Sequence, residues 1–292
     1  RKKHYFDSSR LVIGLKQIIW GYFMKVVIAD RLALYVNATF NNVDAHNGTS
    51  LLIGTVFFAF QIYCDFAGYS NIAIGASRIM GFDLMKNFNR PYFALNISEF
   101  WHRWHISLST WFRDYVYIPL GGNRVSKSRN YLNLFITFAL SGIWHGASWT
   151  FFIWGSIHGF FLIIQKFLKF DKIECDSIFI KKIGLIMFNF IIVLVAWIFF
   201  RANSLSDAFK VLEKIILDPG LPFTESATTL LYGLFGLSIL IIKEIMDEFS
   251  PNRCNSFENS NSLISAFKTA VLIVIILSIG VFDGSQFIYF QF

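Results

Sequence analysis

The sequence predicts an all-α, polytopic integral membrane protein, and three observations carry that prediction. Of its 292 residues, 55% are hydrophobic and 18% are aromatic. Only 15% are charged, whereas soluble domains carry about 25% charged residues. Several apolar stretches are also long enough to cross a bilayer as helices. The net charge of +7 is modest; it fits cytoplasmic loops and anionic lipid head groups, and it gives no reason to expect a nucleic-acid partner.

The N-terminal part combines apolar helices with isolated charges. Residues 11–40 are interrupted by Lys, Arg and Asp residues and predict a tilted or partly interfacial helix. Residues 50–63 are strongly apolar and lead into a Gly- and Ala-containing helix that ends at Gly81. Asp65 lies near the junction, where a carboxylate at membrane depth needs a partner or water, and Arg78 is the partner that the sequence offers.

Residues 98–117 predict one amphipathic helix. Aromatic residues at spacings of three and four form a broad stripe, which favours the membrane interface or the wall of a wet cavity. A second face is polar and comprises His102, His105, Ser109 and Arg113. An interfacial anchor without chemistry is the competing interpretation.

Residues 131–165 are too many for one span of about 20 residues and barely enough for two. Polar residues recur there every four positions and therefore stack on one face of a helix, namely Asn133, Thr137, Ser141 and His145. An ionisable side chain in such a segment predicts a functional site, and a core histidine bonded to a backbone carbonyl is the alternative. Two spans would place His145 toward the side opposite the basic loops, whereas a re-entrant half would place it near the midplane.

The remaining segments are plainer. Spans are predicted over residues 183–200, 227–243 and 263–282, a short amphipathic surface helix over 203–217, and a solvated loop over 244–262. The three cysteines are widely spread, so neither a disulfide framework nor a zinc site is suggested. No signal peptide is visible. The chain begins at Arg1 rather than Met, which suggests the C-terminal part of a larger protein.

The histidine-bearing segments leave three chemistries open. A metal site would need a third ligand beyond His102 and His105 and lacks the carboxylate of an H-E-x-x-H pattern, so no metal is expected. A transporter would use histidines and a carboxylate as a proton path. An acyltransferase would use a neutral imidazole to take the proton of an acceptor hydroxyl that attacks a thioester. The residues alone leave transport and acyl transfer close to equal.

Seven segments form an ordered string of motifs along the chain. They are 63–75 (YCDFAGYSNIAIG), 87–92 (NFNRPY), 99–115 (EFWHRWHISLSTWFRDY), 117–124 (YIPLGGNR), 142–147 (GIWHGA), 197–202 (WIFFRA) and 286–292 (QFIYFQF). Together they resemble the membrane-bound O-acyltransferase (MBOAT) family and, within it, the alginate O-acetyltransferase branch. The string covers nearly the whole chain and is far more specific than any short pattern.

The resemblance implies one transmembrane domain over residues 1–292, with interfacial and re-entrant helices around a central reaction chamber. It implies that His145 is the catalytic residue and that His105 is a second polar residue of the chamber. His102 stands where relatives often carry Arg and receives no role. We therefore expect His145 to act as general base and His105 to orient a reactant or stabilise the carbonyl oxygen. Further candidates for the chamber wall are Asn133, Thr137, Ser141, Ser109, Arg113 and Asp65.

The resemblance also implies substrates and location. The acceptor in this branch is an extracytoplasmic polysaccharide, often reached through a periplasmic partner acyltransferase, and the protein is a multi-pass protein of the inner membrane. The donor is expected to be a cytoplasmic thioester, most simply acetyl-CoA, with Arg124, Lys127 and Arg129 as candidates for binding its phosphates. No tightly bound cofactor is expected. A branch that transfers D-alanine from an acyl carrier protein is the alternative. Relatives carry more transmembrane helices ahead of the segment that matches Arg1, so part of the chamber wall is expected to be missing.

Overall fold

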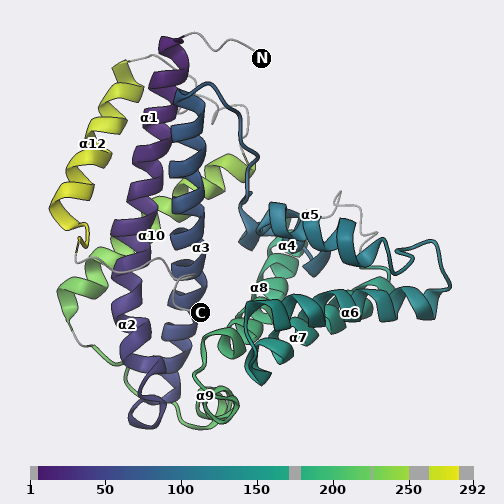
Figure 1. Cartoon of the computed structure of the whole chain (residues 1–292). Coiled ribbons are helices and arrows are strands. Elements are labelled where there is room, and N and C mark those ends of the chain that lie inside the picture. Colours follow the sequence, from purple (N-terminus) through teal and green to yellow (C-terminus); the bar gives the residue numbers. More distant parts are fainter. Residues whose placement is uncertain (1–5, 171–178, 225, 250–262, 283–292) are drawn as a thin grey trace. The chain divides into compact units, whose positions relative to one another are not determined.

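The computed structural model describes residues 6–170, 179–224, 226–249 and 263–282, and every regular element within these ranges is a helix (Figure 1). The described residues form two compact units. The first unit draws on residues up to Thr39, on Val56–Lys86 and on residues from Pro222 onward, and the second draws on Phe40–Thr55 and Asn87–Leu221.

Five helices among the described residues are long and apolar enough to cross a membrane. They are Ser8–Phe40, Gly48–Ile79, Trp149–Phe167, Phe179–Arg201 and Ala227–Phe249. Each approaches or exceeds the roughly 20 residues that the hydrocarbon core requires. A shorter apolar helix, α12, spans Leu263–Ile279. The predicted all-α, multi-pass membrane protein is therefore confirmed.

The first long helix is continuous, although the sequence predicts a tilted or partly interfacial one over residues 11–40. It consists of α1 (Ser8–Tyr22), a π-helical turn η1 (Phe23–Ala29) and α2 (Asp30–Phe40). The carboxylate of Asp7 caps its start by accepting two amide protons of the first turn. Lys16 and Asp30, two of the residues that suggested an interfacial position, are buried. These two charged residues therefore lie inside the first unit, and they do not indicate an interfacial helix.

The helix α3 (Gly48–Ile79) packs against α1 through glycines (Figure 1). A Cβ atom on Gly21 would lie 2.6 Å from the carbonyl oxygen of Gly68, and one on Gly68 would lie 2.7 Å from that of Gly21. Gly14 and Gly75 repeat this contact two turns away. Small residues that let two backbones touch are a common way of joining helices within a membrane.

A buried ionic cluster lies one turn beyond these glycines. The Lys25 Nζ atom lies 2.7 Å from Asp30 Oδ1 and 2.5 Å from Asp65 Oδ1. Lys25 and Asp30 are five residues apart, a spacing that an α-helix places on different faces and that the π-helical turn brings together. Asp65 forms an ion pair with Lys25. The sequence instead suggests Arg78 as the partner of Asp65.

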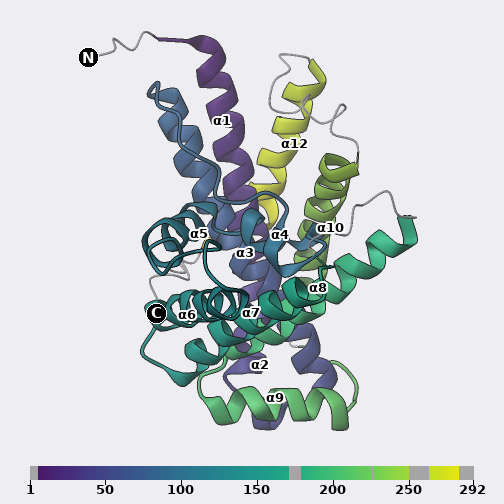
Figure 2. The ribbon, with the colours of Figure 1, turned by 90° about the vertical axis from the view of Figure 1, so that its right-hand side faces the viewer.

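The second unit contains a hairpin of two helices, α6 (Lys127–His145) and α7 (Trp149–Phe167), which lie side by side (Figure 2). Residues 131–165 thus form two helices, of which α7 alone is among the candidate spans found in the described residues. The helix α8 (Phe179–Arg201) packs against α7. The other described helices of this unit are η2 (Val43–Ala45), η3 (Pro91–Phe93), α4 (Ile97–Arg103), α5 (Ile106–Phe112), η4 (Arg113–Tyr117), α8 (Phe179–Arg201) and α9 (Leu205–Leu217).

The helix α10 (Ala227–Phe249) extends farther than the predicted span. The predicted loop over 244–262 is therefore wrong for its first part, and residues 250–262 lie outside the described ones. Glu244 is buried, and the hydroxyl of Tyr63 on α3 donates a short hydrogen bond to its Oε1 atom. An acidic residue that suggests a loop in the sequence is thus part of a polar contact between two helices of the first unit.

Replacing Lys25 with Met should strongly destabilise the protein. The substitution leaves the Asp30 and Asp65 carboxylates buried without this cation, and breaking a buried ion pair costs about 3–5 kcal/mol. We expect this loss of unfolding free energy in chemical unfolding of the full-length protein in detergent micelles.

Lys210→Met is the matched control. Lys210 pairs with Asp44 at 2.9 Å on the surface, where such a pair contributes about 0–1 kcal/mol. A double variant, Lys25→Met with Asp65→Asn, removes one negative charge together with the cation and should recover part of the stability. Equal losses for Lys25→Met and Lys210→Met would contradict this account of the cluster.

Candidate active site

Two glycines hold the end of α6 against α7. A Cβ atom on Gly142 would overlap the carbonyl oxygen of Phe151, and a Cβ atom on Gly155 would overlap that of Phe138. The two backbones are therefore in direct contact just before α6 ends at His145. This contact fixes where the backbone of His145 lies relative to α7.

Aromatic rings surround the imidazole of His145. The imidazole centroid lies 5.0 Å from the ring of Trp154, at an interplanar angle of 88°, and 5.2 Å from the ring of Phe200 on α8. The rings of Trp144 and Phe151 lie at 5.0 and 6.4 Å. Edge-to-face contacts of this kind prefer a defined ring orientation. Three helices of the second unit thus orient this side chain.

His105 lies at a break between α4 and α5, so the prediction of one helix over residues 98–117 is wrong. Its backbone has φ = 39° and ψ = 57°, which is the left-handed conformation. That conformation costs a non-glycine residue about 1–3 kcal/mol, and such outliers cluster at functional sites. The break also divides the aromatic stripe, because Trp104 is buried in the core whereas Trp111 is exposed.

Burial lowers the pKa of both histidines, which lie outside the candidate membrane spans. The pKa of His105 falls to about 4 because desolvation disfavours the charged imidazole. The pKa of His145 falls to about 3, mainly through desolvation and further through its electrostatic interaction with His105. The two imidazoles are therefore close enough to influence each other, and both are neutral at pH 7.

A cleft of about 450 Å³ lies among α4, α5, η4, α6 and α7. Four of the residues predicted for a chamber wall line it, namely Ser109, Arg113, Thr137 and Ser141. Ser141 precedes His145 by one helical turn, and Ile106, which also lines the cleft, directly follows His105. His105 and His145 are thus close in the sequence to lining residues, but neither imidazole is itself among the residues that line the cleft.

Two other predicted wall residues lie elsewhere. Asn133 is fully buried, and its side-chain amide donates to the carbonyl oxygens of Leu120 at 3.0 Å and Gly122 at 3.3 Å. Asn133 therefore connects α6 to the preceding loop through these two hydrogen bonds. Asp65 belongs to the first unit and pairs with Lys25.

The residues predicted to bind a donor are exposed and lie outside the lining of the cleft; they are Arg124, Lys127 and Arg129. Within the described residues, the Lys and Arg side chains of the lining are Arg113 and Lys166. Arg113 pairs with Asp114 at 2.7 Å, and the Lys166 ammonium donates to Asn130 Oδ1 at 2.6 Å. Lys166 was not predicted, although it follows the lining residue Leu162 by four positions and so shares its face of α7.

His158 is a buried histidine that the sequence did not single out. It is fully buried on α7, where its ring stacks on Phe100 at 5.9 Å and meets Trp101 at 5.1 Å and Trp154 at 5.2 Å. Within the described part of the chain, neither of its ring nitrogens has a hydrogen-bond partner. Trp154 therefore contacts both His145 and His158, and the spacing of four from Trp154 is the signal that places His158 on that face.

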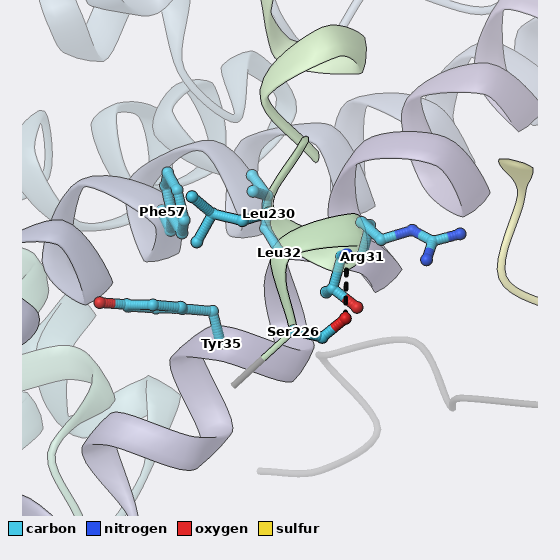
Figure 3. A pocket seen from close by; sticks show the side chains of 7 residues that line it. Arg31, Leu32, Tyr35, Phe57, Ser226 and Leu230 are labelled. Carbon is cyan, nitrogen blue, oxygen red and sulfur yellow. Dashed lines mark hydrogen bonds between the residues drawn. The ribbon is translucent and has the colours of Figure 1, made fainter. Parts of the chain in front are cut away.

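A second cavity, in the first unit, is too small for a substrate. It measures about 10 Å³, close to the space that one water molecule needs. Figure 3 shows Arg31, Tyr35, Phe57, Ser226 and Leu230 around it. Across the described ranges, no group of three or more His, Cys, Asp or Glu residues could hold a metal ion. The cleft of the second unit is thus the better substrate site.

A family model described as MBOAT, membrane-bound O-acyltransferase family, matches residues 1–206. The chain is 45% identical over 197 residues to the probable alginate O-acetylase AlgI of Azotobacter vinelandii, which covers 68% of this chain and 38% of that protein. It is 37% identical over 280 residues to the peptidoglycan O-acetyltransferase of Helicobacter pylori, which covers 94% of this chain and 50% of that protein. It is also 32% identical over 177 residues to the teichoic acid D-alanyltransferase of Bacillus subtilis, at 58% and 44% coverage.

The chain thus spans half or less of the length of these curated relatives. The region matched by the family model nevertheless contains both histidines and all residues that line the cleft. By this match, and as its motif string predicts, the chain belongs to the membrane-bound O-acyltransferase family.

Proposed function

We propose that this chain carries the catalytic site of an O-acyltransferase that moves an acetyl group onto hydroxyls of an extracytoplasmic polysaccharide. The observation that supports it best is the pair of neutral histidines, His105 and His145, beside the cleft. The relatives named as O-acetylating enzymes of alginate and peptidoglycan support acetyl as the acyl group and a polysaccharide as the acceptor.

In the proposed reaction, neutral His145 takes the proton of the acceptor hydroxyl as its oxygen attacks the thioester carbonyl. A new C–O ester bond forms, the C–S bond breaks, and the departing thiolate receives the proton from His145. The imidazole is neutral again at the end, so protons and charges balance. The lowered pKa of His145 makes it a weaker base. Stabilisation of the transition state elsewhere therefore matters, and we assign His105 to stabilise the negative charge that develops on the carbonyl oxygen.

The donor in this proposal is acetyl-CoA or another acyl thioester, which binds as a co-substrate and not as a tightly held cofactor. Aromatic lining residues such as Trp101 and Phe138 suit its thioester arm, and Arg113 and Lys166 suit its phosphates. The exposed residues Arg124, Lys127 and Arg129 add positive charge outside the cleft. A cytoplasmic donor and an extracytoplasmic acceptor fit a multi-pass protein of the inner membrane with a periplasmic partner acyltransferase.

D-alanyl transfer from an acyl carrier protein is the second candidate, favoured by the identity to the teichoic acid D-alanyltransferase. Both reactions use a hydroxyl to attack a thioester, so the same two histidines would serve either. The donors differ in kind, since one is a small molecule and the other is a protein.

Replacing His145 with Ala in the full-length protein should abolish acyl transfer, because a general base contributes about 10²–10⁴ in rate. Membranes incubated with radiolabelled acetyl-CoA would show loss of label from polymer and partner protein, at an unchanged amount of protein in the membrane. His46→Ala, at the end of η2, is the control and should label normally. Wild-type labelling by His145→Ala would overturn the assignment, and solute flux without acylated product would indicate a transporter.

The rate of acyl transfer should be nearly flat between about pH 5 and pH 8. With pKa values of about 4 and 3, His105 and His145 stay neutral over this range. They become protonated only at lower pH, where His145 can no longer accept a proton from the acceptor hydroxyl. An imidazole with the ordinary pKa near 6.5 would instead lose its basic form progressively below that pH. Single-turnover rates in membranes or micelles measure this, and a loss of rate with a midpoint near pH 6.5 would contradict the burial of the pair.

A further inference from the structure

The helix α5 begins without a cap from its own first residue. His105 occupies the N-cap position, where Ser, Thr, Asp or Asn normally accepts an amide proton of the first turn. The imidazole accepts no such bond from the described residues of that turn. The first amides of α5 therefore depend on another part of the chain.

Asn87 supplies the hydrogen-bond acceptors for the first two amides of α5. Its backbone carbonyl oxygen accepts the amide proton of Ile106 at 2.9 Å, and its side-chain Oδ1 accepts that of Ser107 at 3.2 Å. These are the first two amides of α5, so a residue far away in the sequence caps the helix. The imidazole of His105 is consequently not used for capping, although it stands at the cap position.

The rest of this segment holds the other side of the break. The amide of Asn89 donates to the carbonyl oxygen of Arg103, the last residue of α4, at 2.9 Å. The ring of Phe88 meets Trp104 edge-on at 5.0 Å and stacks on the imidazole of His105 at 6.4 Å. Residues 87–89 thus form hydrogen bonds with the end of α4 and with the start of α5. We call these three residues the Asn87 clamp.

We propose that Asn87 is a positioning residue for His105, acting through the cap that it provides for α5. A left-handed His persists only when its surroundings hold it there, and the Asn87 clamp makes hydrogen bonds to the backbone on both sides of the break. If the chain ran as one continuous helix through residue 105, the imidazole would project from the backbone in a different direction. The inference deepens the proposed function, because it rests on His105 taking part in acyl transfer.

Kinetics of the full-length protein test the proposal with two substitutions and one control. Asn87→Ala removes the side-chain acceptor and should lower kcat by about ten- to a hundredfold while KM for the donor changes by less than about twofold. Asn87→Asp keeps an acceptor oxygen and should retain most of the activity. Asn89→Ala changes only an exposed side chain and keeps the backbone amide that donates to Arg103, so it should behave as wild type.

A chemical readout that does not depend on turnover separates this proposal from the proposed function. Carbethoxylation of His105 by diethyl pyrocarbonate, followed by peptide mass spectrometry, should be several-fold faster in Asn87→Ala than in wild type, with His46 unchanged as an internal reference. If His105→Ala were fully active, the catalytic role of His105 would fail, and the changed reactivity would still support the clamp. The proposal is overturned if Asn87→Ala matches Asn89→Ala in reactivity, or if Asn87→Asp is as impaired as Asn87→Ala.

Discussion

The backbone contact between α6 and α7 is the constraint on which the rest of the site depends. At Gly142 and Gly155 no side chain fits between the two helices, so their register is set by the backbones themselves. That register brings the end of α6 to Trp154, whose ring then contacts His145 on one side and His158 on the other. Because rings pack closely and tolerate little displacement, the same contact determines how α4 and α8 can lie against the hairpin.

Irregular backbone places some of the ionisable residues in each unit. In the first unit a π-helical turn brings Lys25 to Asp30, and in the second a left-handed residue turns the chain at His105. Both departures cost free energy and both are held by contacts from other segments, through Asp65 in one unit and Asn87 in the other. In the described residues, glycine-lined contacts join regular helices, and at Lys25 and His105 an irregular backbone positions an ionisable side chain.

Much of this architecture follows from sequence periodicity, and the exceptions have physical causes. The long apolar helices and the polar stripe were predictable, and Thr137 and Ser141 of that stripe do line the cleft. The break at His105 was not, because the acceptors that stabilise it come from Asn87 and leave no trace in local periodicity. The ion pairs of Lys25, and the membership of Glu244 in a helix, were missed for the same reason, since a charged residue looks solvated until its partner on another helix is known.

The neutral histidine pair beside the cleft is the central claim, and a cryo-electron microscopy structure of the full-length protein with a bound donor analogue tests it most directly. The analogue is a ketone form of acetyl-CoA, in which a methylene separates the sulfur from the carbonyl carbon so that no transfer occurs. The account predicts its carbonyl group within hydrogen-bond reach of His105 and next to His145, with the arm that carries the sulfur in the cleft beside Trp101. An analogue bound elsewhere, with both histidines away from its carbonyl group, would contradict it.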